Sequence, residues 1–156
     1  MRTSVDVHNY LIERNAPHEV FQAGGRFRSP ERMAAVLDLP PAEVGRVIIF
    51  ESEDGAVAAV VPVDRDPDVR LLRRAARRDV VERADDQRTA ELTDYLPEAV
   101  PPAGLPNGIA LILDRSLRTD EVLYFPGGEP KAVLKIRGTD LARATGAKVA
   151  RITREP

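Results

Sequence analysis

The sequence contains no cysteine and no tryptophan, and only 4% of its 156 residues are aromatic. The absence of cysteine excludes disulfide bonds, thiolate metal ligands and a cysteine nucleophile. Because aromatic side chains are scarce, the core must be built from valine, leucine, isoleucine and alanine. The charged fraction of 31% and the apolar fraction of 43% are ordinary for a soluble globular protein.

Long hydrophobic runs and a strong net charge are also lacking. The longest apolar run, residues 56–63, is far too short to span a bilayer. The start of the chain has no hydrophobic signal core, so we expect a cytoplasmic protein. The formal net charge of −2 gives no overall attraction to nucleic acid, and any site for a polyanion must therefore be local. At this length we expect one domain, residues 1–156, with room for a real core.

Two apolar segments, residues 44–50 and 56–62, organise the chain. Asp54-Gly55 between them is a strong signal for the turn of a β-hairpin. Such apolar segments are typical of central strands that are buried on both faces. Arg46, which opens the first segment, breaks the pattern. A buried guanidinium is costly unless it extends to solvent or faces a cleft or a fixed anion, and the residue alone leaves these alternatives open.

The remaining patterns alternate between helices and short strands, which argues for an α+β fold. Ser29-Pro30-Glu31, for example, combines an N-cap, a proline at the first helical position and an acid in the first turn. We expect about seven strands in a curved, mostly mixed or antiparallel sheet flanked by helices. The helices are predicted at residues 4–14, 30–37, 69–78, 86–92 and 139–145, and strands outside the hairpin at 18–21, 80–81, 109–113, 122–125, 132–136 and 148–152.

The segment 69–78 shows the clearest amphipathic pattern in the sequence. At about 100° per residue, its arginines fall on one side of a helix and its apolar residues on the other. A solvated face is one explanation. The other is a surface that tracks the phosphates of a ligand, which requires charge of one sign. The arginines concerned are Arg70, Arg73, Arg74, Arg77 and Arg78.

Residues 95–108 contain four prolines and two glycines, which predicts a stiff loop. A long ordered loop inside a compact domain is more often functional than not. Gly104 within it would allow close approach of a ligand to the backbone.

The order of these segments resembles that of a known family. After the Ser-Pro-Glu helix start come LDLPPAEVGRVIIF, DGAVAAVVPVDRDPDVRLLRRA, ELTDYLPEAVPPAGLP, LILDRSL, VLYFPGG and DLARATGAKVARIT. From about Ser29 to Thr153 the chain resembles the YbaK/prolyl-tRNA-synthetase-associated editing domain family. The resemblance implies that family's fold and hydrolysis, in trans, of the ester bond of mischarged aminoacyl-tRNA, which serves translation fidelity. It also implies tRNA as the partner, with no metal and no organic cofactor.

The resemblance further implies a small pocket beside the mouth of the sheet. Arg46 stands where the family usually has its active-site lysine, which makes Arg46 the implied catalytic residue. Glu98 occupies the glycine position of the family's Gly-x-x-x-Pro loop, and Pro102 the proline position. These departures bear on activity rather than on fold. The implied substrate-binding residues are Val47, Pro102, Ala103, Gly104, Gly127 and Gly128.

Ester hydrolysis needs an oriented water, a stabilised oxyanion and a seat for the acceptor end of tRNA. We expect Arg46 to face the stiff proline loop across that seat. Its guanidinium can clamp a phosphate or polarise a carbonyl, but it cannot act as a general base. Glu98 could act as a base, although its charge would also repel phosphate.

Three functional hypotheses remain open from the sequence. The first is a divergent trans-editing deacylase, and the second is a binding module that has lost hydrolysis and recognises tRNA, an amino acid or a protein. The third is an unrelated small-molecule hydrolase on the same fold. His8 and His18 are the only histidines, too few for a credible metal site, and no serine has a histidine spaced for a triad.

Overall fold

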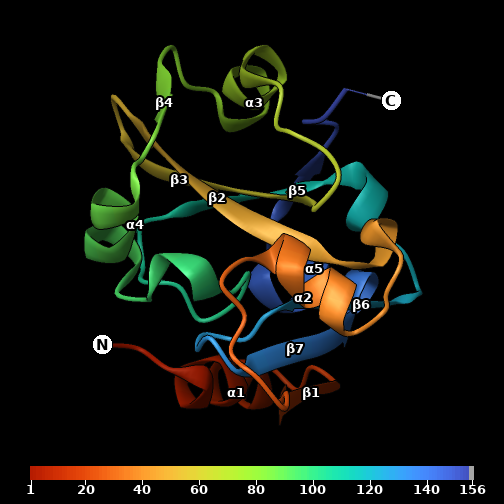
Figure 1. The fold of residues 1–156 in the computed structure, drawn as a ribbon. Coiled ribbons are helices and arrows are strands. Elements are labelled where there is room, and N and C mark those ends of the chain that lie inside the picture. Colours follow the sequence, from red (N-terminus) through yellow and green to blue (C-terminus); the bar gives the residue numbers. More distant parts are fainter. Residues whose placement is uncertain (155–156) are drawn as a thin grey trace.

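The computed structural model describes residues 1–154. Within that range the chain forms five α-helices and eight β-strands (Figure 1). The α+β class is confirmed; the strand count differs slightly from the prediction, and the strands divide between two sheets. The strands are β1 (His18–Gln22), β2 (Gly45–Ser52), β3 (Gly55–Pro62), β4 (Val81–Arg83), β5 (Ala110–Asp114), β6 (Val122–Pro126), β7 (Ala132–Arg137) and β8 (Lys148–Ala150).

The helices begin where the sequence supplies capping side chains. Thr3 and Asp6 form a capping box at the first helix, and the side chains of Ser29 and Asp85 cap the second and fourth. None of the helices within residues 1–154 has the length and apolar composition that a bilayer crossing requires. They are α1 (Ser4–Glu13), α2 (Pro30–Val36), α3 (Val69–Ala76), α4 (Asp86–Thr93) and α5 (Gly138–Thr145), with 3₁₀ turns η1 (Pro41–Glu43), η2 (Pro97–Ala99) and η3 (Arg115–Leu117).

The predicted hairpin is the centre of the larger sheet, whose strand order is β4-β2-β3-β5-β8. β2 and β3 pair antiparallel with Ser52 opposite Gly55 at the turn, where Gly55 has a φ of 93°. β5 pairs with β3 in parallel, and β8 with β5. Residues 56–62 of β3 are all buried, as expected for a central strand covered on both faces.

The smaller sheet, β1-β7-β6, packs against the larger one through the start of β2. An isolated bridge joins Val44 to Tyr124 in parallel. Gly45 lies so close to β6 that a Cβ there would sit 2.2 Å from the ring of Phe125. One apolar core lies between the two sheets and includes α1 residues, and a second lies between the larger sheet and α3. A third, smaller core lies under α2.

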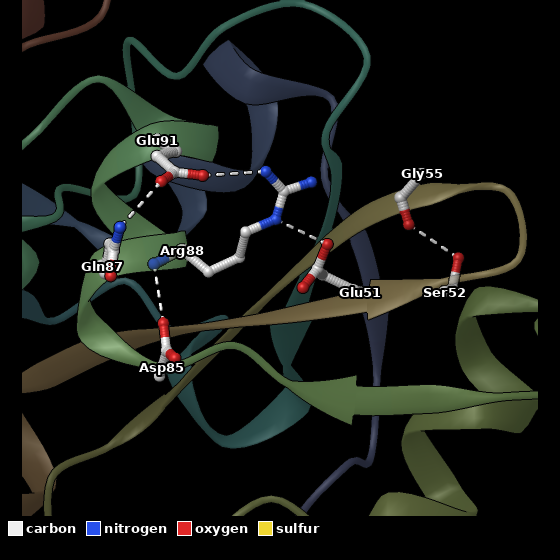
Figure 2. Close-up of polar contacts among 7 residues, drawn as sticks. All are labelled: Glu51, Ser52, Gly55, Asp85, Gln87, Arg88 and Glu91. Atoms are coloured by element: carbon white, nitrogen blue, oxygen red, sulfur yellow. Dashed lines mark hydrogen bonds and ion pairs between the residues drawn. The ribbon is translucent and has the colours of Figure 1, made fainter.

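Helix α4 is fastened to β2 by Arg88, as Figure 2 shows. The Nε of Arg88 donates to Glu51 on β2 at 2.8 Å, and its Nη1 donates to Glu91 one turn along at 3.0 Å. The side chain of Asp85 accepts the backbone N–H of Arg88 at 2.8 Å. These contacts hold α4 against β2.

Two predicted helix boundaries are wrong. Helix α3 ends at Ala76 rather than at residue 78, because Arg77 adopts a left-handed conformation and the Glu53 carboxylate accepts the N–H groups of Asp79 and Val80. Helix α5 begins at Gly138 rather than at residue 139, and the Thr139 hydroxyl donates to Asp120 at 3.1 Å.

Candidate functional site

Arg46 is held in an ion-pair cluster at the start of β2. One terminal nitrogen donates to Asp66 at 2.6 Å and to the carbonyl of Arg65 at 2.9 Å, and the other donates to Glu31 at 3.2 Å. The Arg46 side chain is only 15% exposed, whereas the Asp66 side chain is 87% exposed. The guanidinium thus links the first turn of α2 to the turn after β3, and it faces two carboxylates.

The hydrogen-bond partners of Arg46 lie on α2 and in the turn after β3, and not in the proline-rich loop that it is expected to face. Side chains alternate along a strand, so Arg46 shares its face of β2 with Ile48 and Phe50, which pack in the core under α3. Val47 and Ile49 point to the other face, toward the core that contains Ala103. The one-residue offset between Arg46 and Val47 therefore turns the cation away from the core that contains Ala103 and toward α2 and the turn after β3.

The predicted substrate-binding glycines are packed against the chain itself. Gly104 has a φ of 78°, and a Cβ there would lie 3.1 Å from the Tyr95 hydroxyl. A Cβ at Gly128 would lie 3.0 Å from backbone atoms of Thr3, and the Gly128 N–H donates to Ala99 at 3.0 Å. All five predicted residues of the loop and the β6–β7 turn are buried, namely Pro102, Ala103, Gly104, Gly127 and Gly128. The three loop residues among them also line a hollow of about 180 Å³ beside Tyr10 of α1.

A narrow crevice lies beside these segments, between the N-terminus of α2, the loop and the β6–β7 turn. Its volume is about 10 Å³, which is room for a single water molecule. Glu129 at its edge accepts hydrogen bonds from the backbone and hydroxyl of Ser4. Glu98 is half-buried, and residues 1–154 supply it with no hydrogen-bond partner. The lining residues are Phe27, Ser29, Pro30, Met33, Glu98, Pro126, Glu129, Pro130 and Ala132.

Sequence reasoning missed most of this crevice. Ser29 was recognised only as a helix cap, which it is, with its hydroxyl accepting the N–H of Arg32 at 3.1 Å. Phe27 and Met33 belong to the small core under α2. The alignment of Glu98 with a family glycine was the one sequence signal that pointed here.

A second, wider concavity runs between α3, the turn after β3 and the C-terminal segment. It consists of three hollows of about 690, 440 and 280 Å³ that share lining residues. Arg154 and the α3 N-cap Asp68 form an ion pair of 2.6 Å inside it. The hydrogen bonds from Arg154 and from the Leu71 N–H lower the pKa of Asp68. We call this concavity the arginine groove, after Arg65, Arg70, Arg73, Arg115, Arg151 and Arg154, which line it.

The five arginines predicted to contact tRNA do not share one surface. Arg70 and Arg73 line the arginine groove, whereas the exposed Arg74 and Arg77 lie outside it. Arg78 is turned inward: its Nε donates to the Ser52 hydroxyl at 3.1 Å and one terminal nitrogen to the Ala76 carbonyl at 2.8 Å. The prediction that Arg78 belongs to the exposed helix face is therefore wrong, because the helix ends two residues earlier.

One comparison with known proteins shows the family, and another shows the fold. The family model for the aminoacyl-tRNA editing domain matches residues 26–144. A comparison with curated proteins found no match. Among solved structures, hypothetical protein APE2540 is 28% identical over 96% of this chain and 99% of its own, with a TM-score of 0.89. A proposed trans-editing enzyme for prolyl tRNA synthetase has the same fold, with 22% identity over 99% of both chains and a TM-score of 0.85. The chain belongs to the aminoacyl-tRNA editing domain family.

Proposed function

We propose that this protein is a deacylase that hydrolyses, in trans, the ester bond of mischarged aminoacyl-tRNA. The family match over residues 26–144 is the observation that carries the proposal. The crevice supports it, because Glu98 of the proline-rich loop and Pro126 at the end of β6 line it, although none of the six substrate-binding residues that the resemblance implied does. With a volume of about 10 Å³, the crevice has room for the attacking water alone, and we propose that a small aminoacyl group lies at its edge.

Glu98 is the group that we propose to orient the attacking water. Its carboxylate lies at the crevice, and within residues 1–154 it has no competing hydrogen bond. A carboxylate can hold a water and take up its proton as the water attacks the ester carbonyl. Phe27, Met33 and Pro126 give the crevice apolar walls, which exclude other water and strengthen the electrostatic interactions inside.

Arg46 is proposed to supply positive charge to the acceptor end of the tRNA rather than to move protons. For this its guanidinium must exchange Asp66 for a phosphate. The exchange costs little, since an ion pair with a carboxylate as exposed as Asp66 contributes at most about 1 kcal/mol. Arginine is suited to the task because its planar fork binds phosphate through two parallel hydrogen bonds.

The test is a panel of mischarged tRNAs incubated with the wild type, Arg46→Lys and Glu98→Gln. We expect the wild type to release small amino acids at least tenfold faster than spontaneous hydrolysis. Glu98→Gln, which has the same shape without a base, should lose about 10²-fold or more of that rate. If a folded preparation shows no ester loss above the spontaneous rate on any member of the panel, the deacylase proposal fails.

The second candidate is a binding module that recognises aminoacyl-tRNA without hydrolysing it. The observation that favours it is the neutralisation of Arg46 by Glu31 and Asp66, which leaves no free cation at the family's lysine position. This candidate predicts salt-sensitive tRNA binding together with a spontaneous rate of ester loss. The same panel, run beside a tRNA-binding assay, separates the two candidates.

A further inference from the structure

The arginine groove concentrates positive charge on a chain whose net charge is −2. Six arginines line it, against four aspartates, Asp64, Asp66, Asp68 and Asp114. Three of the aspartates are already engaged inside the protein. Asp66 binds Arg46, Asp68 caps α3 and binds Arg154, and the buried Asp114 binds the backbone of Ile152.

Most of the arginines, in contrast, keep their charge available. Among the described residues, Arg154 is the only one of the six in an ion pair. Five of the six are exposed, and Arg65 is half-buried. A concave surface with uncompensated cations attracts a polyanion even on an acidic protein, because the field is local and is focused by the walls.

Three segments far apart in the sequence build the groove. The turn after β3 and the start of α3 form one wall, and Arg151 and Arg154 line the groove beside them. The backbone joins these two segments, with Asp68 donating to Ile152 at 2.7 Å and Pro67 bridging to Thr153. Arg115 of η3 completes the far end. The cations therefore sit on an ordered scaffold.

The groove also reaches the candidate site. Asp66 lines the groove and binds the guanidinium of Arg46, and Arg65 lines it while its carbonyl accepts a hydrogen bond from Arg46. A phosphate backbone that lies in the groove therefore extends toward Arg46. Since no aromatic side chain lines any of the three hollows, the groove lacks the stacking platforms that single-stranded nucleic acid uses.

From these observations we infer that the arginine groove binds the phosphate backbone of a double-stranded RNA stem, the acceptor stem of the tRNA, and directs its end toward Arg46. The inference rests on the proposed function for the identity of the RNA. Contacts of this kind position the RNA without reading its sequence. Arg74 and Arg77, which lie outside the groove, are then expected to make no contact with the RNA.

The experiment measures binding of an uncharged, fluorescently labelled RNA hairpin with an acceptor-stem duplex, by anisotropy over a range of salt concentrations. The groove variant carries Arg70→Glu and Arg115→Glu, whose side chains form no ion pair within residues 1–154. The control variant carries Arg74→Glu and Arg77→Glu, which make the same change in net charge on the outward side of α3. Circular dichroism and thermal melting verify that both variants are folded.

We expect the groove variant to bind at least tenfold more weakly than the wild type, with a salt slope lower by about 2, while the control variant changes affinity less than threefold. A control variant that loses as much affinity as the groove variant overturns the inference, as does a wild type that does not bind the hairpin at low salt. Because the hairpin carries no ester, the result is independent of hydrolysis. If the RNA binds in the groove but no deacylation is seen, the proposed enzyme activity is contradicted while the inference about the groove stands.

Discussion

At the scale of single residues, Arg46 is a charged side chain that is largely buried and only partly hydrogen-bonded. Its terminal nitrogens make three hydrogen bonds, yet its Nε is buried and has no partner within residues 1–154. A buried donor without a partner costs about 1–3 kcal/mol. Part of the stabilisation that the ion pairs contribute is therefore offset by the same side chain.

Arg46→Lys is consequently expected to change the free energy of unfolding by less than about 1 kcal/mol, because the lysine loses some hydrogen bonds but also removes the unpartnered donor. Urea denaturation of both proteins at pH 7 measures the difference. Any change in deacylation by this variant then reflects chemistry and not folding. A loss of more than 2 kcal/mol would instead mean that the three hydrogen bonds of Arg46 are a main support of α2.

Tyr95 is a second residue whose environment dictates a measurable effect. It is fully buried, and its hydroxyl donates to the Gly104 carbonyl at 2.8 Å, which ties the two halves of the proline-rich loop together. Burial raises the pKa of Tyr95, and the nearby negative charge of Asp6 adds to the effect. The phenol thus stays protonated in the folded protein where a free tyrosine would ionise.

Tyr95→Phe should lower the free energy of unfolding by about 1 kcal/mol at pH 7, through the lost hydrogen bond. Above about pH 10 the unfolded wild type releases the phenolic proton while the folded protein keeps it, so the wild type loses stability as the pH rises. At pH 11 this loss is about 1.4 kcal/mol, and the advantage of the wild type over Tyr95→Phe should be gone. Denaturation curves at both pH values test this; a constant gap between the two proteins would contradict it.

At the scale of elements, local patterns in the sequence predicted most helices and strands, and failed where a distant residue intervenes. The caps of α1, α2 and α4 are local, and the Ser29 cap of α2 was predicted correctly. The end of α3 is not local. Glu53 on the β-hairpin turn accepts two backbone N–H groups beyond the helix, and the hydrogen bond from Asp79 is the main cause of the lowered Glu53 pKa.

Arg77 ends α3 in a left-handed conformation, with φ of 56° and ψ of 50°. Glycine adopts this conformation without the steric cost that a Cβ brings. Arg77→Gly is therefore expected to stabilise the protein by about 0.5–1 kcal/mol, which thermal melting would register as a rise of a few degrees. RNA affinity should stay within about twofold of the wild type, because Arg77 does not line the groove. A lower melting temperature would show that the arginine side chain stabilises the helix end.

At the scale of the whole molecule, the candidate site depends on contacts that no local pattern encodes. Arg70 and Arg73 were found from the sequence because they lie on one turn of one helix. Arg115, Arg151 and Arg154 are isolated in the sequence and join them only because β5 and β8 lie side by side. For the same reason the facing of Arg46 could not be predicted, since it depends on which side of the sheet each core occupies.

Asp114 is the residue on which this long-range assembly depends most. It is buried at the end of β5 and accepts hydrogen bonds from the Ile152 N–H at 2.9 Å, the Thr153 hydroxyl at 3.2 Å and the Ser116 N–H at 3.2 Å. It thereby holds the C-terminal segment, with its two groove arginines, against η3. Asp114 is an acidic residue and cannot attract RNA phosphate. Any effect of Asp114 on RNA binding must therefore come from positioning Arg151 and Arg154.

Asp114→Ala is expected to cost about 3 kcal/mol, since it leaves the buried Ile152 N–H unpaired and also removes the acceptor of the Thr153 hydroxyl and the Ser116 N–H. At a temperature where the variant is still folded, the Ile152 amide should exchange with deuterium much faster, and RNA affinity should fall severalfold because the groove is no longer preorganised. Thr153→Val is the matched control: it removes one hydroxyl donor but keeps the bond from Ile152, so affinity should hold. If affinity survives in Asp114→Ala while Ile152 exchanges freely, then the arginines of the C-terminal segment do not need their anchor to bind RNA.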